Sequence, residues 1–156
     1  MTINRNPVRQ LKQSFSLVAL LLLPLAFLGG RAAEPVATPE KLKAWRAAGE
    51  QGDAQTQNYL GYLYSNGAGV KKDLEEAARW YRKASQQGNV SAQYSLGYLF
   101  YTGAGLPKDA TQAAEWWLKA AEKGHVLAQY NLGLMYFHGE GVPKNAAQSI
   151  TWYRRA

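Results

Sequence analysis

The stretch Leu60–Asp73 reads LGYLYSNGAGVKKD, and the chain contains two further versions of it. Leu96–Asp109 reads LGYLFYTGAGLPKD and Leu132–Asn145 reads LGLMYFHGEGVPKN, so each version begins 36 residues after the one before. A period between about 20 and 50 residues indicates supersecondary units that stack to bury a shared core. The spacing therefore predicts an all-α fold, a solenoid of antiparallel helix pairs.

Each unit reads as two helices joined at the glycines. The first helix is expected to begin near Asp53, Ser91 or Leu127 and to end at the tyrosine or phenylalanine before the first glycine. A helix commonly ends on a residue in the left-handed conformation, which glycine adopts without a steric cost. This role is predicted for three glycines: Gly67, Gly103 and Gly139. The Gly-x-Gly is thus interpreted as a turn, because a nucleotide-binding loop needs GxGxxG after a strand.

The second helix of each unit is expected to open with a capping box, in which two side chains satisfy two backbone donors reciprocally. The pairs, each three residues apart, are Asp73 with Glu76, Asp109 with Gln112 and Asn145 with Gln148. The lysines that precede these caps, Lys72, Lys108 and Lys144, are expected to be solvated.

This pattern divides the chain into segments. Residues 33–37 form a leader, 38–52 a capping half-repeat that starts at Thr38-Pro39, and 53–88, 89–124 and 125–156 three repeats. In the third repeat no later helix covers Ile150 and Trp152, which are therefore expected to be exposed here and to pack against a second copy or a continuation of the chain.

Residues 1–32 have the pattern of an export signal. Arg5, Arg9 and Lys12 precede an uncharged apolar run, 15–28, that is shorter than the roughly 20 residues a spanning helix needs. Cleavage is expected after Ala32, which predicts a periplasmic or secreted protein; the alternative is an uncleaved anchor in the inner membrane.

Composition limits the classes of partner. The chain has no cysteine, so neither a disulfide framework nor a lipoprotein anchor is expected. Four of the 18 basic residues lie in 1–32, and the remaining 14 exceed the 11 acidic residues by three. The basic excess therefore belongs largely to the export signal, which argues against nucleic acid as a partner.

The segment Ala92–Gly124, AQYSLGYLFYTGAGLPKDATQAAEWWLKAAEKG, resembles a Sel-1-like repeat, a relative of the tetratricopeptide unit, and the resemblance extends from Trp45 to Ala156. It implies a right-handed superhelix of helix pairs that acts as an adaptor for proteins or peptides, sometimes in cell-envelope signalling and secretion. One exported branch of the family carries a cysteine pair per repeat and is linked with beta-lactam binding. Since this chain has no cysteine, that property is not transferred.

Residues that recur in all three units are interpreted as core, because three identical active sites are improbable. In tetratricopeptide-like units the first helix lines the concave face, and helical spacing defines its exposed line of side chains. We call the six rings on this line the aromatic stripe: Tyr62, Tyr94, Tyr98, Tyr101, Tyr130 and Phe137. Tyrosine joins area, rigidity and a polar tip at interfaces, so the stripe is the predicted partner-binding site. The alternative is that Tyr94 and Tyr130 pack between neighbouring first helices.

Catalytic, cofactor and metal sites are not expected. His125 and His138 have no cysteine or carboxylate at ligand spacing and are interpreted as solvated loop residues. Ser-x-x-Lys, G-x-S-x-G and HExxH are absent. The sequence therefore predicts a non-enzymatic scaffold for a protein or peptide partner in envelope signalling or assembly. The alternatives are a module that binds peptidoglycan or carbohydrate and, less favoured, an envelope amide hydrolase.

Overall fold

The computed structural model of the protein describes residues 37–156. Its contacts divide the chain into two units, Met1–Glu34 and Pro35–Ala156, and the described residues all belong to the second. The predicted export signal and its cleavage site after Ala32 lie outside the described residues.

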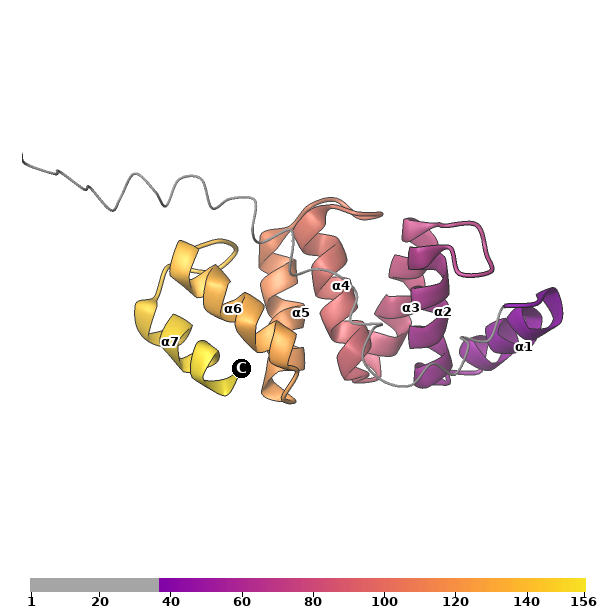
Figure 1. Cartoon of the computed structure of the whole chain (residues 1–156), viewed down its shortest axis with the longest axis horizontal. Helices are drawn as coiled ribbons and strands as arrows, with labels where there is room; N and C mark the ends of the chain where they lie inside the picture. Colours follow the sequence, from indigo (N-terminus) through magenta and orange to yellow (C-terminus); the bar gives the residue numbers. More distant parts are fainter. Residues whose placement is uncertain (1–36) are drawn as a thin grey trace, which may run out of the picture. The chain divides into compact units, whose positions relative to one another are not determined.

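Residues 37–156 form helices joined by short turns, with no strand among them (Figure 1). The capping half-repeat is α1 (Pro39–Glu50), which is N-capped by the Thr38 side chain and has a proline in its first turn, as predicted. The repeats are the pairs α2 (Ala54–Asn66) with α3 (Leu74–Gln86), α4 (Val90–Thr102) with α5 (Ala110–Glu122), and α6 (Val126–His138) with α7 (Ala146–Arg155). Each helix contacts the next one along the chain, which is the all-α helical repeat fold predicted from the period.

The two glycines of each turn have different duties. Gly67, Gly103 and Gly139 are left-handed C-caps of α2, α4 and α6, which confirms the prediction. The second glycine contacts the preceding repeat: a Cβ on Gly105 would lie 2.4 Å from the Leu74 carbonyl carbon, and one on Gly141 would lie 2.2 Å from the Ala110 carbonyl oxygen. Glycine at this second position therefore allows consecutive repeats to stack.

The Leu-Gly pair of each first helix forms the contact inside a repeat. Leu60, Leu96 and Leu132 are fully buried. The neighbouring glycines lie against aromatic rings of the second helix: Gly61 on Tyr81, Gly97 on Trp117 and Gly133 on Tyr153. A glycine is required here because the ring occupies the place of a side chain, so each hairpin closes around one aromatic residue.

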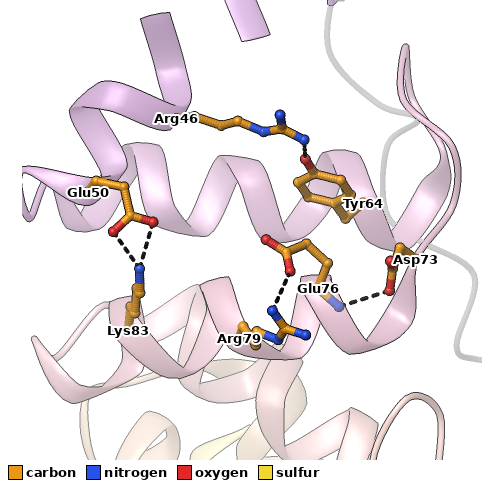
Figure 2. Close-up of polar contacts among 7 residues, drawn as sticks. All are labelled: Arg46, Glu50, Tyr64, Asp73, Glu76, Arg79 and Lys83. Atoms are coloured by element: carbon orange, nitrogen blue, oxygen red, sulfur yellow. Dashed lines mark hydrogen bonds and ion pairs between the residues drawn. The ribbon is translucent and has the colours of Figure 1, made fainter. Parts of the chain in front are cut away.

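The capping boxes form only in part. Asp73 accepts a hydrogen bond from the Glu76 backbone at 2.9 Å (Figure 2). The Asp73 backbone N–H, however, donates to the Tyr64 carbonyl instead of to Glu76. The Glu76 carboxylate pairs with Arg79 at 3.2 Å. The reciprocal half of the prediction is wrong, because the turn brings the carbonyl before the glycines within reach of the cap. The same bond recurs from Asp109 and Asn145.

Candidate functional site

The aromatic stripe divides into rings that the fold uses and rings that remain accessible. Four of its tyrosines are half-buried: Tyr62, Tyr94, Tyr98 and Tyr101. Tyr130 is exposed, and Phe137 exposes 52% of its surface, which is large for a phenylalanine. The stripe is thus most accessible on α6, in the third repeat.

Two of the half-buried rings connect the second and third repeats. Tyr94 stacks on His125 with the ring centroids 4.4 Å apart. Tyr101 lies 5.3 Å from the Trp117 ring, and its hydroxyl donates to Glu140 at 3.1 Å. Burial raises the pKa of Tyr101, and the nearby Glu140 carboxylate raises this pKa further. Packing between neighbouring helices, the alternative considered for Tyr94, therefore accounts for much of the surface of these two residues.

Tyr62 and Tyr130 make ring contacts within their own repeats. Tyr62 stacks on Tyr59 at 6.3 Å between centroids, and Tyr130 is tilted against Tyr153 at 5.6 Å. Tyr98 packs against the core along one side and is half-buried. Together with Phe137, these residues supply the part of the stripe that a partner can contact.

Two lysines that the sequence analysis assigned to solvent lie beside the stripe. Lys108 Nζ is 5.7 Å from the centroid of the Tyr101 ring, and Lys144 Nζ is 6.0 Å from that of Phe137. Both distances allow a cation–π attraction of about 0.5–1 kcal/mol at an exposed site. The repeat itself is the signal that could have found them, because both lysines lie seven residues after the ring that they approach.

His125 has a structural duty that was not predicted. It is the N-cap of α6, its Nδ1 accepts from the Ala128 backbone at 3.3 Å, and it is half-buried beneath Tyr94. Burial lowers its pKa. The interpretation as a solvated loop residue is wrong for His125, because Asp53 and Asn89 hold the same cap position in the earlier repeats. His138 is exposed, as expected.

The expectation that Trp152 is exposed is also wrong, since only 6% of its surface is accessible. In the first repeat, Trp80 at the matching position packs backward: a Cβ on Gly49 would lie 2.9 Å from the Trp80 ring. Burial of this tryptophan therefore does not require a following repeat. Ile150, by contrast, is 51% exposed, whereas Ala78 and Ala114 at its position are buried.

A broad cavity of about 840 Å³ lies between α1 and the α2–α3 turn. Arg46 crosses its edge and donates a hydrogen bond to the Tyr64 hydroxyl, as Figure 2 shows. Lys83 Nζ donates to both carboxylate oxygens of Glu50, at 2.9 and 2.8 Å. These contacts connect α1 to the first repeat.

Residues 37–156 contain no group of three or more histidine, cysteine or acidic residues that could hold a metal ion. In the same range, no helix has both the length and the apolar character needed to cross a membrane.

The helix pairs repeat the same contacts at matching positions, and this defines a helical repeat protein. A sequence model of the Sel1 repeat matches residues 54–89, 90–125 and 126–156, and the chain therefore belongs to the Sel1 repeat family.

Solved structures support this assignment. A Sel1 repeat protein from Oxalobacter formigenes is 38% identical to this chain, with a TM-score of 0.71. The match covers 75% of this chain and 48% of that one. A protective antigen of uropathogenic Escherichia coli with an SLR fold is 43% identical with a TM-score of 0.70, and 73% of this chain covers 24% of it. The chain thus spans about half and a quarter of their lengths.

A third structure, cysteine-rich protein B of Helicobacter pylori, shows the fold alone. It is 22% identical with a TM-score of 0.57, and 76% of this chain covers 89% of that chain. A comparison with curated protein sequences found no match.

Proposed function

We propose that the protein is an exported, non-enzymatic adaptor of the bacterial cell envelope that binds a protein or peptide partner along its aromatic stripe. Membership of the Sel1 repeat family supports a role in protein–protein interaction. Residues 1–32 support export, and sequencing of the mature N-terminus tests it: a chain that begins at Ala33 is expected, whereas an intact Met1 indicates the membrane-anchored alternative.

The observation that carries the proposal is that each of three consecutive first helices holds a stripe ring with accessible surface. Tyr62 on α2, Tyr98 on α4 and Tyr130 on α6 follow one another, and Phe137 ends the line with more than half of its surface exposed. Rings held on packed helices lose little rotational freedom on binding, which favours affinity. We infer that the partner is an extended or helical segment with apolar side chains for the rings.

The lysines beside the stripe define a second requirement for the partner. Lys108 and Lys144 lie at its edge, next to Tyr101 and Phe137. Each is exposed, so it can pair with an acidic side chain of the partner while it stays near its ring. A segment that combines apolar and acidic residues therefore complements the site, and its association is expected to weaken as salt is raised.

The test replaces accessible stripe residues only. The assay crosslinks the protein, from the stripe, to envelope proteins that bind it. The double variant Tyr98→Ala, Phe137→Ala is expected to capture none of them, while its circular dichroism melt stays nearly unchanged. Glu115→Ala is the control, because Glu115 is exposed on α5, a helix that carries no stripe residue. Unaltered capture by the double variant contradicts the proposal. Capture of cell-wall sacculi instead of protein favours the carbohydrate alternative, and hydrolysis of a muropeptide favours the amide hydrolase.

Self-association is a second proposal, and the exposure of α7 supports it. Ile150 is exposed where Ala78 and Ala114 are buried, and Tyr153 is exposed where Trp117 is buried. We propose that this part of α7 pairs two copies of the chain. Sedimentation at micromolar concentration is expected to show a dimer that Ile150→Asp converts to monomer. A wild-type chain that sediments as a monomer contradicts this.

A further inference from the structure

A second cavity, of about 490 Å³, lies where the first repeat meets the second, and it shares no residue with the aromatic stripe. Its walls come from the C-terminal end of α3, the start of α4 and the last turns of α5. Its lining includes Ser85, Gln93, Trp116 and Lys123. The volume falls within the range of about 300–1,000 Å³ that is usual for small-ligand sites.

Two side chains that line this cavity each carry a buried polar atom without a partner among the described residues. Ser85 and Gln93 expose only 2% and 4% of their surfaces, and neither Ser85 Oγ nor Gln93 Oε1 has a hydrogen-bond partner among residues 37–156. The other end of the Gln93 amide is occupied, since Nε2 donates to the Ser85 carbonyl at 3.2 Å. Most buried polar groups in proteins are paired, and an unpaired one costs about 1–3 kcal/mol. An incoming group that reaches these two atoms would therefore find an acceptor and a hydroxyl unpaired.

The first repeat shows how the chain itself closes the equivalent position. Gln57, which corresponds to Gln93, donates to the Gly49 carbonyl at 2.8 Å, and its Oε1 accepts from the Gln87 carboxamide at 2.7 Å. Trp80 is buried against Gly49. In this repeat a side-chain carboxamide satisfies the buried acceptor.

In the second repeat the closing group is missing. Lys123 stands at the position of Gln87, and its Nζ donates to the Gly88 carbonyl at 2.9 Å instead of reaching Gln93. Ser85 stands at the position of Gly49, and Trp116 is half-buried, unlike Trp80. The residues that differ between the two repeats, Ser85 and Lys123, thus line the cavity together with the unpaired Gln93.

We propose that this cavity binds the carboxamide side chain of a glutamine or asparagine from the protein partner. The carboxamide NH₂ donates to Gln93 Oε1, its carbonyl accepts from the Ser85 hydroxyl, and the side-chain stem contacts Trp116. The inference rests on the proposed function as a binding module and names a second point of contact for its partner, separate from the stripe.

The test titrates the full chain with N-acetyl-L-glutaminamide and follows the side-chain amide of Gln93 and the indole N–H of Trp116 by NMR. We expect saturable shifts with a dissociation constant in the millimolar range, about what one buried amide contact supports. N-acetyl-L-alaninamide, which lacks the side-chain carboxamide, is expected to give no saturable shift. Equal shifts with both probes, or none with either, overturn the proposal, and tighter binding of N,N′-diacetylchitobiose identifies a sugar site instead.

The variant Lys123→Gln copies the first repeat, so it is expected to close the cavity from within. Its binding of the glutamine probe should be weaker by at least about tenfold, while its thermal melt stays at or above that of the wild type. Lys71→Gln, a surface change elsewhere, is the control and should bind as the wild type does. Wild-type affinity in Lys123→Gln overturns the proposal. Because no stripe residue changes, the result is independent of the test of the stripe.

Discussion

The indole ring of Trp117 lies directly on Gly97, so that a Cβ at Gly97 would be 2.6 Å from Trp117 Cδ1. Glycine in the middle of a helix is about 1 kcal/mol less favourable than alanine, yet each first helix keeps one at this place. The position of the ring explains why the glycine is retained.

We expect Gly97→Ala to lower the free energy of unfolding by about 1–3 kcal/mol in spite of its better helix propensity, because the rigid ring must move. Urea denaturation measures the change. Ser91→Ala, an exposed substitution on the same helix, is the control and should change little. A more stable Gly97→Ala protein would show that the ring contact does not limit this position.

The second glycine of the turn should matter more than the first. Gly103 and Gly105 both have a left-handed backbone, with φ of 73° at each, so alanine strains both. At Gly105 the methyl group also meets the Leu74 backbone of the preceding repeat. We expect Gly105→Ala to lower the thermal midpoint clearly more than Gly103→Ala does, and equal losses would rule out the inter-repeat contact as the cause.

The buried glutamines allow a matched comparison. Gln57 makes hydrogen bonds through both ends of its amide, whereas Gln129 donates to the Ala121 carbonyl and its Oε1 has no partner among residues 37–156. Gln57→Leu should therefore be more destabilising than Gln129→Leu, by about 1 kcal/mol for the additional bond. Denaturant titration of the two variants checks the order, and the reverse order would contradict this account.

His125 should make stability depend on pH. Burial holds its pKa in the folded chain below the ordinary value of 6.5, so the unfolded chain binds its proton more readily. The contribution to stability is complete above pH 6.5 and is lost as the pH falls from there toward the folded pKa. Protonated Nδ1 also cannot accept from Ala128.

Comparison with His125→Asn isolates this effect, because Asn89 already caps α4 through the same bond. Denaturation midpoints at about pH 7.5 and about pH 5 should differ less in the variant than in the wild type. An identical pH dependence in both proteins would show that His125 does not titrate with folding.

The period of 36 residues was enough to predict the helices, their left-handed caps and the repeat fold, because these depend on residues that recur. The sequence could not reveal contacts that depend on the tilt of one helix against another. Examples are the stacking of Tyr94 on His125 and the burial of Trp152.

The candidate sites were predicted less completely than the fold. Helical spacing placed the stripe rings on one helix face, but it did not show that Tyr101 bonds Glu140, which lies 39 residues later. The cavity at Ser85 was missed because its signal is a difference between repeats, Gln87 against Lys123, at positions that the sequence analysis did not compare.

Gly49, Ser85 and Ala121 occupy one position in successive units; Gly49 lies against Trp80, whereas Ser85 lines a cavity together with Trp116. A duplicated module can therefore acquire a recognition function through substitutions at a few such places. Its neighbours meanwhile keep the architecture intact, so folding and the evolution of specificity are largely decoupled along the chain.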